Sequence, residues 1–309
     1  MSSPPVPASL SLEILGLRVA VDCADAAVAD LVIANCGAMI APAGHAKAEL
    51  GYRIRRDESA ATYALTRGDD PPVACADLDD LSFALEKDLT VELQRRRREL
   101  LFLHAAAVEW QGFVILLAAA SGSGKSTTAW ALLHHGFRFL SDELAPIDLA
   151  TTSVLPYPHA LCLKHEPAPP YALPADALRH GERIHVPTNA LPGATVTAPL
   201  PLAAAFLLSY RSHLDRPELR PLGTAEASAR LYVTALNPLA HANQGLDAVV
   251  GIAESMPCFA LASAGLAPTC ELIRDTTARI VDGRAQGVTE AVRRRPSLRR
   301  APTHRSPRR

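Results

Sequence analysis

The sequence predicts an α/β fold, and the order of its apolar and glycine-rich segments carries that prediction. A strand-like apolar segment at 113–119 leads into a run of small residues and then into a helix at 127–135. Gly136 is expected to end this helix, and another strand follows at 137–141. A strand, a glycine-rich loop, a helix and a second strand in this order are typical of α/β domains.

A smaller, strand-rich α+β region is predicted before this domain. Residues 1–9 read as a flexible leader, and short strand signals fill 10–66. A helix is expected next, with Asp77 as its N-cap, because leucines recur at steps of three and four residues from Leu78 to Leu93. The arginines at 95–98 fall near the end of this helix, where the helix dipole favours cations. A solvated helix end is therefore preferred there over a phosphate-binding patch.

The remaining segments complete a three-part organisation. Strands are predicted at 101–110, 203–211 and 258–263, and helices at 225–235 and 266–281. From Gly283 onward the apolar periodicity is lost, and nine arginines stand against one glutamate. The sequence thus predicts an N-terminal region at 1–100, the main domain at 101–282 and a disordered basic tail at 283–309.

Composition restricts the partners and the compartment. Hydrophobic residues make up 49% and charged residues 20% of the chain, with a net charge of −1, so neither nucleic acid nor a membrane surface is expected as the main partner. The six cysteines include no Cys-x-x-Cys pair, which argues against a zinc site or a disulfide framework. No signal peptide is recognised, and no apolar run approaches the roughly 20 residues of a membrane helix, so the protein is expected to be cytoplasmic. The sequence leaves a homo-oligomer open.

The small residues after 119 form the strongest chemical signal in the chain. They resemble the pattern Gly-x-x-x-x-Gly-Lys-[Ser/Thr], with Ala119 in place of the first glycine. Backbone N–H groups of such a loop, a helix N-terminus and a lysine together suit the phosphates of ATP, while a serine hydroxyl suits Mg²⁺. The predicted nucleotide-binding residues are Ser121, Gly122, Ser123, Gly124, Lys125, Ser126 and Thr127, with Ser126 also a magnesium ligand.

Acidic residues follow the loop at the end of the next predicted strand. If that strand runs parallel to the loop strand, a right-handed crossover brings both strand ends to the same edge of the sheet. Asp142 and Glu143 are therefore expected beside the loop, within reach of the γ-phosphate or its metal. His104, on the strand before the loop strand, has two readings that the residues alone leave open: a core histidine or a site residue.

The stretch from Leu103 to Asp148 resembles the catalytic domain of HPr kinase/phosphorylase. A histidine-containing strand, a loop ending in Gly-Lys-Ser and an acidic pair occur there in the same order, with His104, Lys125 and Asp142 as landmarks. The wider chain, through 156–161 and Lys164, looks like HPr-kinase-related proteins found beside peptide-modifying systems, including those of lasso peptides. The resemblance implies a P-loop kinase domain of the HPr kinase catalytic type.

That resemblance also implies a function and residue roles. The chain would be an ATP- and Mg²⁺-dependent kinase acting on a Ser/Thr hydroxyl of a small protein or peptide, such as a lasso-type precursor. Asp142 would be the general base, His104 would support it, and Glu143 or Ser126 would hold Mg²⁺. Two alternatives remain: a P-loop ATPase or nucleotide switch in which Glu143 polarises water, and a module that binds nucleotide without catalysis.

Overall fold

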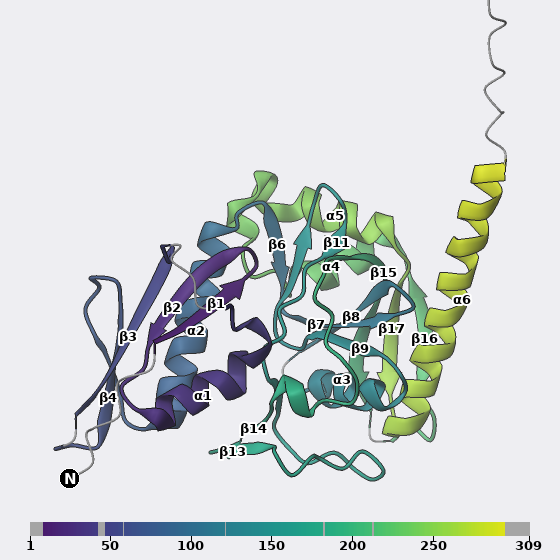
Figure 1. Cartoon of the computed structure of the whole chain (residues 1–309). Coiled ribbons are helices and arrows are strands. Elements are labelled where there is room, and N and C mark those ends of the chain that lie inside the picture. The colour runs from purple at the N-terminus through teal and green to yellow at the C-terminus, as the bar shows by residue number, and fades with distance from the viewer. Residues whose placement is uncertain are drawn as a thin grey trace, which may run out of the picture.

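A computed structural model describes residues 9–42, 47–57, 59–120, 122–181, 183–211 and 213–293, except for the side chains of 180 and 285–293. The fold is mixed α/β with several sheets (Figure 1). The predictions for the leader up to residue 8, for Ser121 and for residues 294–309 fall outside the described residues. No helix within the described residues is long and apolar enough to cross a membrane.

The N-terminal region is a sheet packed against two helices. The strand order is β1-β2-β3-β4-β5, in which only the β2–β3 pair is parallel. Its helices are α1 and α2, and Asp77 caps α2 as predicted, since its side chain accepts a hydrogen bond from the Asp80 N–H. The bounds are β1 Ser9–Ile14, β2 Leu17–Asp22, α1 Ala26–Cys36, β3 Leu50–Asp57, β4 Thr62–Arg67, β5 Val73–Cys75 and α2 Leu78–Arg96.

Two local features in this region differ from the sequence prediction. Within the stretch of strand signals at 10–66, residues 12–19 form a hairpin, because Leu15 and Gly16 both adopt positive φ and turn the chain. The strand-like reading of 10–66 also missed α1, whose Asp25 side chain accepts a hydrogen bond from the Val28 N–H. The exposed face of α1 carries alanines and Ile33 with a single charged residue, Asp30, so the segment lacks the polar face that marks a surface helix.

The larger sheet has the order β6-β10-β11-β15-β8-β7-β9, and β17 and β16 extend it from β15. Its strands are β6 Leu100–Leu103, β7 Ala105–Trp110, β8 Phe113–Ala119, β9 Arg138–Ser141, β10 Ala145–Asp148, β11 Ser153–Val154, β15 Leu200–Tyr210, β16 Glu218–Leu222 and β17 Cys258–Ser263. A small separate sheet has the order β12-β14-β13, from Leu161–Leu163, Arg183–Val186 and Leu178–His180.

Helices cover both faces of the larger sheet. Alternate residues of β7, β8 and β15 pack on α3 (Lys125–His134) and α6 (Leu266–Arg293), and the small sheet joins this core. The intervening residues pack on α4 (Thr224–Tyr232) and α5 (Leu246–Ser255). The strands are buried on both faces, which explains why they read as continuous apolar runs.

Helix α6 extends well beyond the end predicted at residue 281. It runs to Arg293, so the helical chain continues into the segment predicted as a disordered tail from Gly283. Arg284 donates hydrogen bonds to the carbonyl oxygens of Leu202, Ala203 and Ser255, so that its side chain contacts the main domain. Arg284, which lies in the segment predicted as a tail, thus contacts the main domain. The sequence gives no sign of this contact, because a guanidinium can bond to carbonyl groups at strand and helix ends without any apolar periodicity.

Candidate active site

The glycine-rich loop joins β8 to α3, as the sequence predicts. Gly122 and Gly124 have φ values of 82° and 87°, in the left-handed region that favours glycine. Among the described residues, the chain neighbours aside, no heavy atom lies within 4 Å of a Cβ built on either glycine, so this side of the loop is open space. Ser126 and Thr127 lie in the first turn of α3, where backbone N–H groups have no partner within the helix.

The larger sheet brings the loop, the acidic pair and His104 to one edge. Strand β7 lies between β8 and β9 and runs antiparallel to both, so β8 and β9 point the same way without being neighbours. Their carboxyl ends and the amino end of β7 therefore meet at a single edge. Strands β8 and β9 thus run in the same direction, as the predicted crossover requires, but β7 lies between them.

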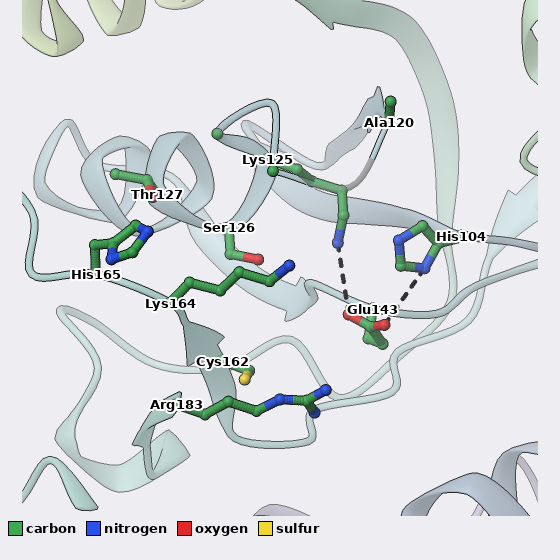
Figure 2. A pocket seen from close by; sticks show the side chains of 12 residues that line it. His104, Ala120, Lys125, Ser126, Thr127, Glu143, Cys162, Lys164, His165 and Arg183 are labelled. Atoms are coloured by element: carbon green, nitrogen blue, oxygen red, sulfur yellow. Dashed lines mark ion pairs between the residues drawn. The ribbon is translucent and has the colours of Figure 1, made fainter. Parts of the chain in front are cut away.

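Lys125 is the centre of the charged contacts at this edge. Its ammonium group donates to the backbone carbonyl of Asp142, and Nζ lies 3.7 Å from Glu143 Oε2. The other carboxylate oxygen of Glu143 lies 3.4 Å from Nδ1 of His104 (Figure 2). Lys125 is buried, whereas the Glu143 side chain is 47% exposed and lies in a cavity.

Asp142 lies beside Lys125 through its backbone, but its carboxylate is turned away from the cavity. The residue is 2% exposed, and Oδ2 accepts a hydrogen bond from the Cys162 N–H at 3.0 Å. Burial raises the pKa of Asp142 to about 6, although Lys125 and the Cys162 N–H both favour the charged form. Cys162 lines the cavity, so the Asp142 carboxylate lies directly behind the cavity wall.

His104 occupies the break between β6 and β7. Its backbone N–H donates to the Thr234 carbonyl at 2.7 Å, outside the sheet ladder. The imidazole is partly exposed and lines the cavity, which favours the site reading over the core reading. Burial lowers the pKa of His104, and the ammonium of Lys125 lowers it further, against the opposing effect of Glu143.

The cavity between these groups has a volume of about 230 Å³ and a second, cationic wall. Figure 2 shows Lys164 and Arg183 extending from the side opposite the glycine-rich loop toward Lys125 and Glu143. Lys164 follows β12 and Arg183 begins β14, so the small sheet supplies this wall. Cys162 and His165 also line it.

Sequence reasoning singled out Lys164 but missed the other residues of the second wall. The strand at 183–186 alternates polar Arg183 and His185 with apolar Ile184 and Val186, and that period of two is the signal that was available. Prolines throughout this part of the chain obscured it. Which residue of such a short strand faces a cavity is decided only by its pairing with β12.

The residues at this edge fit a magnesium-bound nucleoside triphosphate. Mg²⁺ takes one or two protein oxygen ligands and completes its shell with phosphate and water. The Ser126 hydroxyl and the Glu143 carboxylate both line the cavity and are of this type. The open glycine loop and the ammonium of Lys125 suit phosphate oxygens.

The sequence matches no protein-family profile and no curated protein. Among solved structures, the chain is similar to the Hpr(Ser) kinase/phosphatase from Coxiella burnetii, with 13% identity and a TM-score of 0.35. The match covers 63% of this chain and 98% of that one. A likeness of this degree carries no conclusion about activity, so a functional assignment has to stand on the residues of the site.

Proposed function

We propose that the chain is an ATP-dependent kinase that transfers the γ-phosphoryl group to a Ser or Thr hydroxyl of a small protein or peptide. The observation that carries this proposal is the meeting of Lys125, Glu143 and an open glycine-rich loop at one cavity. Phosphoryl transfer depends mostly on positioning and charge neutralisation, and these groups can provide both.

Each cavity residue has a role in this proposal. Loop N–H groups and Lys125 bind the β- and γ-phosphates, and Ser126 with Glu143 holds Mg²⁺. Lys164 and Arg183, on the opposite wall, offset the negative charge that spreads over the phosphoryl oxygens during transfer. Ser121 belongs to the proposed loop by sequence alone.

Asp142 is the proposed general base, and His104 is proposed to support it. The acceptor oxygen forms a bond to the γ-phosphorus, the bond from that phosphorus to the β–γ bridging oxygen breaks, and ADP leaves with the electron pair. The hydroxyl proton passes to the Asp142 carboxylate. A base with a raised pKa suits this step near neutral pH, and the Asp142 carboxylate lies directly behind the cavity wall at Cys162.

One observation favours a second candidate, an ATPase or nucleotide-dependent switch. Glu143 is the more exposed carboxylate and lines the cavity, whereas Asp142 is buried behind the cavity wall. In this reading, Glu143 orients a water molecule for attack on the γ-phosphate, and inorganic phosphate is the product.

Incubation with γ-labelled ATP, Mg²⁺ and a library of Ser/Thr-containing peptides separates the candidates. Labelled peptide supports the kinase, labelled free phosphate without labelled peptide supports the ATPase, and neither product contradicts both. The Lys125→Ala variant is the matched control, because any product that it still forms at the wild-type rate comes from another site or a contaminant.

A further inference from the structure

A chain of mostly buried polar side chains leads from the N-terminal region to the candidate active site. It begins at Ser82 on α2 and passes through Asn35 on α1 to His185 on β14. From there it continues through Cys162 on the small sheet to Asp142. Buried polar groups are costly unless each has a partner, so a chain of this kind fixes the orientation of its members.

Asn35 sets the protonation pattern of His185. Its amide Nδ2 donates to Ser82 Oγ at 3.1 Å, which turns the amide oxygen toward His185. Nδ1 of His185 lies 3.0 Å from that oxygen and therefore carries the hydrogen and donates it. In the neutral imidazole, Nε2 is then left as the acceptor.

Cys162 connects His185 to Asp142. Its sulfur lies 4.0 Å from Nε2 of His185. Burial, together with the nearby Asp142, raises the pKa of Cys162 to about 12, so the group is a thiol that can donate to the imidazole. The backbone N–H of the same residue donates to the Asp142 carboxylate.

The segment that carries Cys162 is also tied directly to α1. The Ala160 N–H donates to the Asn35 carbonyl oxygen at 2.8 Å. Asn35 thus contacts this segment through its backbone and, by way of His185, through its side chain. A shift of α1 would therefore move the groups that orient Asp142.

We propose that Asn35 and His185 are positioning residues for phosphoryl transfer, through which the N-terminal region holds Cys162 and the Asp142 carboxylate in place. This inference rests on the proposed function, in which Asp142 takes the proton of the attacking hydroxyl. Neither residue lines the cavity, and neither touches the glycine-rich loop in the contacts described above. Their influence should fall on the transfer step and not on nucleotide binding.

The Asn35→Leu variant tests this inference. Leucine has a similar volume but lacks the amide oxygen that accepts from Nδ1–H of His185, so the bond that orients the imidazole is lost. The reaction measured is phosphoryl transfer from γ-labelled ATP to a peptide that becomes labelled in the library incubation, or to water if free phosphate is the product. The kcat is expected to fall about tenfold, with the KM for ATP within about twofold of wild type.

A double-mutant cycle separates positioning from general damage. His185→Asn keeps a donor near the Nδ1 position but removes the acceptor for the Cys162 thiol, so it should lower kcat by a similar factor. If Asn35 acts through His185, the double variant is no slower than His185→Asn alone. His185→Asn also maintains the test if Asn35→Leu does not fold.

Val32→Ala on α1 is the control for stability. Val32 is 2% exposed and apolar, so its truncation lowers the melting temperature without touching the polar chain. A kcat loss in Val32→Ala as large as that in Asn35→Leu, or independent effects in the double variant, would overturn the positioning role. An unchanged kcat in Asn35→Leu would also overturn it and leave the kinase proposal standing. A wild-type protein that transfers no phosphate to peptide or water contradicts the proposed function itself.

Discussion

Lys125 and Glu143 face each other across the candidate active site, with Nζ 3.7 Å from Oε2. The carboxylate balances the ammonium group while also lying 3.4 Å from Nδ1 of His104. A triphosphate that binds Lys125 brings more negative charge to Glu143, and Mg²⁺ between the two would relieve that repulsion. The geometry therefore links nucleotide binding to the metal at this residue pair.

Glu143→Gln is expected to separate the metal requirement from nucleotide binding. Loss of the carboxylate should raise the Mg²⁺ concentration for half-maximal turnover about tenfold, since a metal ligand is weakened. The affinity for ATP without Mg²⁺ should stay equal or increase, because a repulsive charge is removed. Titration of Mg²⁺ against turnover, and of ATP in EDTA against fluorescence, measures both. Weaker binding of metal-free ATP would contradict the proposed arrangement.

Lys125→Ala is expected to abolish nucleotide-dependent activity. The ammonium group is buried against the loop edge and is the group best placed to meet the β- and γ-phosphates, so turnover should fall by at least about 100-fold. Lys87→Ala on the exposed surface of α2 is the matched control and should retain wild-type turnover. Near-normal turnover in Lys125→Ala would show that the loop is not the active site.

Asp142→Asn is expected to lower phosphoryl transfer by about 100-fold or more, the usual range for loss of a general base. ATP binding should be retained, because the carboxylate contacts the Cys162 N–H and an amide oxygen can accept the same bond. Rescue of the rate by added Mg²⁺ would identify Asp142 as a metal ligand instead. Unchanged turnover would rule out the kinase mechanism proposed above.

His159 is expected to make the free energy of unfolding decrease as the pH rises into the alkaline range. Burial opposes its charged form, but Glu86, at 3.9 Å, acts with Cys36 and Asp142 to raise its pKa to about 10. The pKa of His159 in the folded protein lies above its unfolded value. The charged imidazole therefore contributes fully to the free energy of unfolding below about pH 6.5, and this contribution is lost as the pH rises to about 10. The difference in unfolding free energy between wild type and His159→Gln should shrink over that range. A constant difference from pH 6.5 to 10 would show that His159 is not charged in the folded protein.

Arg284 should stabilise the main domain although it lies in the segment predicted as a tail. Arg284→Ala removes the guanidinium that contacts Leu202, Ala203 and Ser255, and should cost about 1–2 kcal/mol of unfolding free energy. Truncation after residue 284 should be nearly neutral, whereas truncation before Gly283 should destabilise the protein like Arg284→Ala. Equal stability of the two truncated forms, measured by urea unfolding, would contradict this role.

Local sequence signals predicted several elements well. Asp77 caps α2, and Gln111 and Gly112, which separate the strand predicted to end at 110 from the one predicted to begin at 113, both adopt positive φ in a hairpin turn. Strand β17 has the predicted bounds of 258–263. These features depend on neighbours within a few residues, so the chain encodes them locally.

Other features depend on contacts between distant segments. Helix α1 was hidden because its exposed face is almost as apolar as its buried face. The end of α6 was missed because Arg284 bonds to carbonyl groups about 80 residues away in the chain. Arg183 of the cationic wall was missed for the same reason, since it reaches the cavity only through the pairing of β14 with β12.

The sequence by itself determined the loop, its lysine and the acids that follow it, because spacing along a strand, loop and helix places these groups. Only the tertiary structure decided which acid faces the cavity: Glu143 does, while the Asp142 carboxylate turns to the Cys162 N–H. Adjacent residues at a strand end point in different directions, and their surroundings come from segments the local sequence cannot name. The buried connection from Asn35 to Asp142 likewise exists only because folding brings α1, the small sheet and the end of β9 together.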